Sequence, residues 1–177
     1  MELGELKNKI RSVEDWPKQG IVFRDFSPVL EDRNTFHFLI ERLALEVKDK
    51  EIDKIVGIDA RGFILASALA YKLKVGLAIA RKKGKLPPGN KLKKQYSLEY
   101  AADALEMGQG SIKQGEKVLL VDDVLATGGT MASVVEMVKE SGGEIADVLF
   151  FIELTGLKGR NKLERLIGCP IKSLIKF

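Results

Sequence analysis

The chain has 177 residues, of which 45% are hydrophobic and 31% are charged, and its formal net charge is +4. This length suits one domain, and this composition excludes an intrinsically disordered chain. A single cysteine excludes an internal disulfide and a cysteine-based zinc site, and no apolar run approaches the roughly 20 residues that cross a bilayer. We therefore expect one folded domain that works in the cytoplasm and has no membrane partner.

Apolar spacing predicts alternating helices and strands along the chain. A short helix comes first, with Leu3, Leu6 and Ile10 on one face, and it ends before Pro17 and Gly20. The further elements, each read from its apolar positions, are expected as a helix after Asp32 or Asn34, a strand at 54–58, a helix from Arg61 to Leu73, strands at 75–80 and 118–121, a helix through 131–138, a strand at 146–152, a helix around Leu163 and Leu166, and a strand at 171–175.

This alternation predicts an α/β fold in which helices cover both faces of a central parallel sheet. No linker or repeat divides the chain, so residues 1–177 are expected to form a single domain. Residues 81–110 look too irregular for the core, and we expect a mobile loop region there, placed over the site. Ligands of such sheets bind at the carboxyl ends of the strands.

The most informative stretch is VLLVDDVLATGGTM at 118–131, where an apolar strand leads into two carboxylates, a small-residue turn and a helix. The turn would present backbone N–H groups at a helix N-terminus, which binds phosphate. Asp122 and Asp123 precede the turn and would accept hydrogen bonds from sugar hydroxyls. An ordinary turn with two solvated aspartates is the alternative, and the combination of all the parts argues against it. The turn residues proposed to bind phosphate are Ala126, Thr127, Gly128, Gly129 and Thr130.

This stretch resembles the motif with which type I phosphoribosyltransferases bind 5-phosphoribosyl 1-diphosphate (PRPP). The resemblance implies that 126–130 hold the 5-phosphate and that Asp122 and Asp123 hold the ribose hydroxyls. It also implies the fold of that family, in which a central parallel sheet is flanked by helices and topped by a small hood. In this chain residues 1–33 would contribute to the hood that binds the base.

Three other segments resemble adenine phosphoribosyltransferases, namely GIVFRD at 20–25, ARGF at 60–63 and YSLEY at 96–100. The first implies an adenine site at Val22, Phe23 and Arg24. An aromatic ring such as Phe23 can stack on a purine, although a core position is the alternative. The second segment implies that Arg61 binds pyrophosphate and acts in catalysis, because a guanidinium at a helix head can reach that anion. A structural ion pair is its alternative.

The third segment implies a loop that closes over the site. Glu99 is the candidate acid or base for the purine proton, since a carboxylate in a drier pocket has a raised pKa. Tyr100 is expected to take part in closing the loop and excluding water. A solvated loop carboxylate is the alternative for Glu99.

Seven basic residues and no acidic one lie between Arg81 and Lys94. Within this run Arg81, Lys82 and Lys85 resemble residues that reach the pyrophosphate of a neighbouring subunit, which implies a homodimer. A solvated or nucleic-acid-facing surface is the alternative. The run has no interleaved aromatic residues for base stacking, so we expect no nucleic-acid partner.

Together these features predict purine salvage, in which adenine and PRPP give AMP and diphosphate. Loss of pyrophosphate develops oxocarbenium character at the ribose, and Mg²⁺ held mainly by PRPP, near Asp122 and Asp123, would stabilise the leaving group. One alternative is a PRPP-dependent transferase for another base, against which the FRD and SLEY segments argue. The other is a non-catalytic PRPP-sensing regulator, against which the short first helix of mixed charge argues.

Overall fold

The structure is a computed structural model, and it describes residues 1–97, 102–168 and 170–177. Within these residues seven strands form one sheet in the order β5-β6-β4-β3-β7-β8-β9. Strands β4, β3, β7, β8 and β9 run parallel, and β6 and β5 continue the sheet antiparallel at one edge. The bounds of the strands are β3 Lys54–Ile58, β4 Gly76–Lys82, β5 Lys91–Ser97, β6 Ala102–Gly108, β7 Lys117–Leu125, β8 Glu144–Glu153 and β9 Lys172–Lys176.

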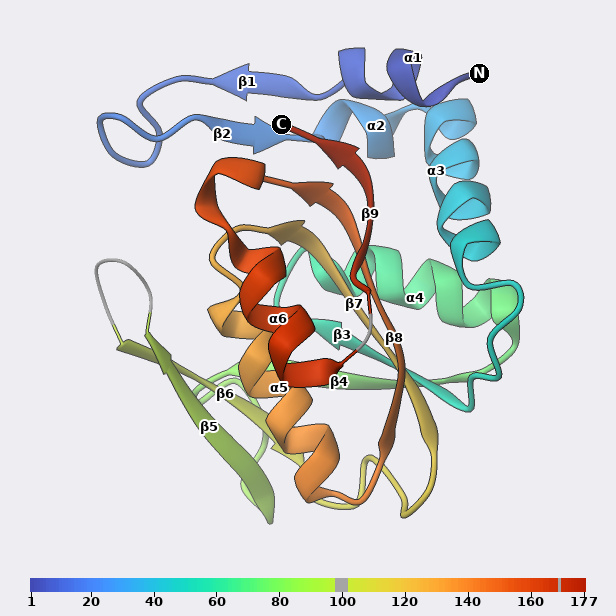
Figure 1. Ribbon diagram of the computed structural model, residues 1–177, viewed down its shortest axis with the longest axis vertical. Coiled ribbons are helices and arrows are strands. Elements are labelled where there is room, and N and C mark those ends of the chain that lie inside the picture. The colour runs from blue at the N-terminus through green and yellow to red at the C-terminus, as the bar shows by residue number, and fades with distance from the viewer. Residues whose placement is uncertain (98–101, 169) are drawn as a thin grey trace.

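Helices cover both faces of this sheet (Figure 1). Helices α3 (Arg33–Glu46) and α4 (Gly62–Leu73) pack on one face, and α5 (Gly129–Glu140) and α6 (Gly159–Ile167) pack on the other. Successive side chains of a strand point to opposite faces of the sheet, so the apolar run of β7 contributes to the hydrophobic cores on both faces. Leu119 belongs to the core under α3 and α4, and its neighbour Leu120 to the core under α5 and α6. A 3-10 turn, η1 (Thr155–Leu157), joins β8 to α6.

The N-terminal residues form a separate small layer at one end of the sheet (Figure 1). It consists of α1 (Leu3–Asn8), β1 (Arg11–Val13), β2 (Phe23–Asp25) and α2 (Ser27–Glu31). Strands β1 and β2 pair antiparallel as a sheet of their own. We call residues 1–31 the hood. It meets the carboxyl ends of the parallel strands, because Arg24 lies over the ring of Phe177 and its carbonyl faces Arg61.

Most of the expected elements are confirmed, and the α/β architecture with them. The strand at 54–58 and the helix ending at Leu73 fall where the apolar pattern predicts. Asp32 begins α3 as expected, because its carboxylate accepts the N–H groups of Asn34 and Thr35 at 3.0 and 2.8 Å. No helix in the described part of the chain is long and apolar enough to cross a bilayer.

The prediction that residues 81–110 are too irregular for the core is wrong, although residues 83–90 form no helix or strand. Strand β4 continues through Lys82, and β5 and β6 pair residue by residue from Lys91–Gly108 to Ser97–Ala102. The lysines of β5 fall on both faces of the strand and hide the alternation, since Lys93 is exposed while its neighbour Lys94 is half-buried and pairs with Glu140 of α5. Leu105 and Met107 of β6 are fully buried. These two strands therefore extend the core sheet.

Candidate active site

The predicted phosphate turn follows β7 directly. Residues 126–128 leave the strand and α5 begins at Gly129. Gly128 has φ 76°, in the left-handed region that glycine adopts without strain. No side chain caps α5, so the N–H groups of its first turn remain available to an anion. A pocket of about 80 Å³ opens here, and Thr127, Gly128 and Thr130 are among the residues that line it.

Asp122 and Asp123 lie side by side within β7, and each is only 9% exposed. Asp122 lines the phosphate pocket, and its Oδ1 accepts the N–H of Asp123 at 2.9 Å. Burial and the neighbouring charge of Asp123 raise the pKa of Asp122 well above its usual value. Helix α4 starts close to this pair, since a Cβ added to Gly62 would lie 2.6 Å from Oδ1 of Asp122.

Arg61 connects the acidic pair to the hood. It precedes α4, and its Nη2 lies 2.5 Å from Oδ2 of Asp123. Its guanidinium also stands over the ring of Phe23, 4.7 Å from the centroid, which is a cation–π arrangement. Oδ2 of Asp123 is buried and makes no hydrogen bond within the described residues, so its contact with Arg61 is an ion pair.

The hood contributes an apolar pocket of about 320 Å³, lined by Val13, Trp16, Phe23 and Asp25. The rings of Trp16 and Phe23 meet edge to face, with centroids 4.5 Å apart. Phe23 is half-buried and faces this pocket, so it is not a residue of the main core. Val22 is exposed beside it. Sequence reasoning missed Trp16 and Asp25, although a lone tryptophan before a proline in a polar loop was an available signal.

The three basic residues lie at the end of β4, beside Asp59, which precedes Arg61 by two residues. Arg81 and Lys82 end β4, and Nε of Arg81 lies 3.5 Å from Oδ2 of Asp59. Nη1 of Arg81 donates to the carbonyl of Lys85 at 2.9 Å. The structure therefore groups Arg81, Lys82 and Lys85 with one another and with Asp59. Glu99 and Tyr100 lie outside the described residues, between the end of β5 and the start of β6.

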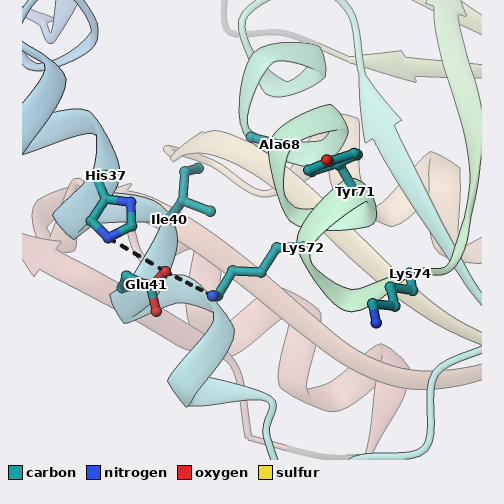
Figure 2. A pocket seen from close by; sticks show the side chains of 7 residues that line it. All are labelled: His37, Ile40, Glu41, Ala68, Tyr71, Lys72 and Lys74. Atoms are coloured by element: carbon teal, nitrogen blue, oxygen red, sulfur yellow. Dashed lines mark ion pairs between the residues drawn. The ribbon is translucent and has the colours of Figure 1, made fainter.

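A wider groove of about 520 Å³ lies elsewhere, between α3 and α4 (Figure 2). Glu41 occupies its centre, 2.7 Å from Nζ of Lys72 and 3.7 Å from Nε2 of His37. The carboxylate offsets the charge of Lys72, and the groove contains no helix N-terminus. The groups that suit a phosphate, a sugar and a planar base thus lie at the sheet end and not in this groove.

Comparison with known proteins agrees with this arrangement. Residues 29–165 match the family model for the phosphoribosyl transferase domain. The chain is 52% identical over 172 residues to the adenine phosphoribosyltransferase of Clostridium botulinum, covering 97% of this chain and 98% of that one. Its fold is similar to that of the adenine phosphoribosyltransferase of Thermoanaerobacter pseudethanolicus, with a TM-score of 0.95, 44% identity, and coverage of 99% of this chain and 100% of that one.

The structure of the Saccharomyces cerevisiae adenine phosphoribosyltransferase, in complex with an imino-altritol bisphosphate and adenine, is also similar. It has a TM-score of 0.88 and 35% identity, and the match covers 97% of each chain. The family model begins at residue 29, whereas the matches to the Clostridium, Thermoanaerobacter and yeast proteins cover 97% or more of this chain and so extend over the hood, the sheet and the phosphate turn together. The chain therefore belongs to the phosphoribosyltransferase family, among the adenine phosphoribosyltransferases.

Proposed function

We propose that this chain transfers the 5-phosphoribosyl group of PRPP to adenine and releases AMP and diphosphate. One observation carries the proposal. Arg61 contacts the carboxylate of Asp123 on one side and the ring of Phe23 on the other. It therefore lies between the carboxylates proposed to bind the sugar and the pocket of the hood. A nucleotide laid along this line would have its phosphate at the turn, its ribose at the aspartates and its base in the hood.

Different residues bind the phosphate, the ribose and the base. The N–H groups of 126–130 hold the 5-phosphate at the start of α5. Asp123 accepts a ribose hydroxyl, and Asp122 accepts the neighbouring hydroxyl. Phe23 stacks on adenine, while backbone groups of Val22 and Arg24 meet the edge of the base. The yeast relative solved with adenine and a bisphosphate supports this division.

In the reaction the bond from C1 of ribose to the pyrophosphate oxygen breaks, and a ring nitrogen of adenine bonds to C1. Positive charge develops on the ribose and negative charge on the leaving pyrophosphate. Arg61 stabilises the leaving group as a fixed cation. Glu99 accepts the proton that the purine nitrogen loses, and Tyr100 helps to close the loop over the site.

Mg²⁺ suits this site as a partner of the substrate. Asp122 and Asp123 offer oxygen atoms, the ligands that Mg²⁺ prefers. The described residues contain no group of three or more side chains that would hold a metal ion, so PRPP would supply most of the remaining ligands. When bound, the ion would neutralise charge on the departing pyrophosphate.

We further propose that the active form is a homodimer in the cytoplasm, without a nucleic-acid or membrane partner. Ile64, Tyr71 and Leu77 are exposed by 42%, 90% and 41%. Ile64 and Tyr71 lie seven residues apart and so share one side of α4, and Leu77 lies on the same face of the sheet as Ile55, under α4. A second copy seated here would meet Arg81 at the other end of β4.

The proposal is tested by initial rates of nucleotide formation with PRPP, Mg²⁺ and a panel of bases. We expect adenine to react and hypoxanthine, guanine and orotate to react far more slowly, because the hood pocket and the flanking backbone select the base. A preference for another base would reassign the substrate. Binding of PRPP without any product would favour a regulator.

A further inference from the structure

Two glycines face each other where α6 meets the phosphate turn. A Cβ added to Gly159 would lie 2.2 Å from the carbonyl oxygen of Ala126 and 2.8 Å from the nitrogen of Gly128. A Cβ added to Gly128 would lie 2.9 Å from the carbonyl oxygen of Gly159. These clearances exclude a side chain at either position. The first turn of α6 is therefore a backbone wall against the phosphate turn.

Arg160, the next residue, fixes this first turn. Its Nε and Nη2 donate to the two carboxylate oxygens of Glu153 at 2.9 and 2.5 Å, which is the fork geometry that only arginine provides. Nη2 also donates to Oγ of Ser173 at 3.1 Å, and Nη1 donates to the carbonyl of Ile171. The side chain of Glu153 is only 5% exposed. The ion pair thus binds α6 to the ends of β8 and β9.

The same ion pair lies beside the origin of the phosphate turn. Glu153 is the last residue of β8 and pairs in register with Leu125, the last residue of β7. The N–H of Leu154 donates to the carbonyl of Leu125 at 2.8 Å. Ala126, whose carbonyl contacts Gly159, follows at once. The turn is therefore held at its start by β8 and along its length by α6.

We propose that Gly159 and the Arg160–Glu153 ion pair are positioning residues for the 5-phosphate of PRPP. None of them touches the phosphate. They keep the turn at 126–128 in the one conformation that presents its N–H groups, and this role rests on the proposed function of the turn. Without the ion pair the first turn of α6 is held less firmly and the phosphate turn is less ordered. The free energy of ordering the turn then reduces the affinity for PRPP.

The test compares two matched ion pairs on β8. Arg160→Met removes the ion pair at the carboxyl end of β8, where the side chains of Arg160 and Glu153 are 25% and 5% exposed. Asp147→Asn breaks the Lys172–Asp147 pair, joined at 2.7 Å and similarly buried at 27% and 4%. Asp147 pairs with Leu119, about 20 Å along the sheet from the phosphate turn. Both variants lose a buried charge partner, and only the first loosens the wall.

We expect Arg160→Met to raise the KM for PRPP about tenfold. Affinity typically falls by this much when a residue that supports a ligand-binding group, without touching the ligand, is lost. The KM for adenine and the kcat at saturating PRPP should not change. Arg160→Lys keeps the charge without the fork and should recover part of the PRPP affinity. Asp147→Asn should keep the KM of the unaltered protein for PRPP, although it too lowers the melting temperature.

A normal KM for PRPP in folded Arg160→Met, or an equal rise in both variants, would overturn the proposal. Should Arg160→Met not fold, Gly159→Ala decides the matter, because it leaves the ion pair intact and pushes directly on the turn. Gly159→Ala must also weaken PRPP binding, and an unchanged KM for PRPP would show that the first turn of α6 does not position the phosphate turn.

The Kd for ribose 5-phosphate, measured by calorimetry, is expected to change in the same way as the KM for PRPP. If the unaltered protein makes no AMP, the proposed function fails, and this Kd still tests the positioning role.

Discussion

At the scale of single residues, short local patterns were enough to place together the residues that we propose to bind the phosphate and the sugar. Asp122, Asp123 and the turn at 126–130 are contiguous, so one strand–turn–helix pattern places them all. Gly159 was missed because its contact with the turn spans the fold, whereas Trp16 was missed although it lies only seven residues before Phe23. A single sequence does not show which distant glycine a turn will meet.

Replacing Asp123 by asparagine keeps the shape of the side chain and removes its charge. We expect PRPP binding to weaken by about 1.5 to 3 kcal/mol, the contribution of a hydrogen bond to a charged acceptor. Calorimetric titration with PRPP measures the change, and circular dichroism shows whether the fold persists. Asp147→Asn, which alters another buried carboxylate on β8, should leave PRPP affinity intact. Equal affinity in Asp123→Asn and the unaltered protein would remove Asp123 from the sugar site.

At the scale of elements, prediction succeeded where apolar runs are long and failed where elements are short or charged. Strand β3 and helix α4 are dominated by buried apolar residues, so their limits follow from periodicity. Strands β1 and β2 have three residues each, too few for a pattern. Strand β5 is rich in lysine, and its pairing with β6 defines it instead.

One carboxylate joins three elements of the hood. Asp25 in β2 accepts the N–H and the hydroxyl of Ser27 in α2 at 2.9 and 2.7 Å, and it pairs with Arg11 in β1. The hydrogen bonds from Ser27, followed by those from Arg11, lower the pKa of Asp25 from 3.8 to about 2. The stabilisation is therefore complete above pH 3.8 and is lost as the pH falls toward 2.

Asp25→Asn should cost about 2 kcal/mol of unfolding free energy at pH 7, and less at pH 3. Urea unfolding at the two pH values measures this difference. Glu14→Gln, an exposed change in the same hood, is the control and should have no effect. A loss for Asp25→Asn that is the same at pH 7 and pH 3 would show that the ionised carboxylate is not what holds the hood together.

At the scale of the whole molecule, the α/β sheet was predicted and its antiparallel edge was not. The assembly of two copies remains a prediction. Its support is the exposed apolar surface of Ile64, Tyr71 and Leu77 and the position of Arg81 at the end of the neighbouring strand. These features suit an interface in which each copy completes the pyrophosphate site of the other.

Subunit exchange tests whether Arg81 acts on the partner. Arg81→Ala is mixed with the double variant Asp122→Ala/Asp123→Ala, each of them nearly inactive alone. If the basic residues act in trans, one site of each heterodimer receives both defects and the other receives neither. Random exchange should then restore about a quarter of the normal activity. If activity does not recover although differently tagged chains have exchanged, the shared site is rejected.

A crystal structure of the protein with AMP would show whether one nucleotide lies across the turn, the aspartates and the hood. We expect the phosphate among the N–H groups of 126–130, the ribose hydroxyls at Asp122 and Asp123, and adenine against Phe23. AMP bound with its phosphate away from this turn, or with its base outside the hood pocket, would overturn the proposed binding mode.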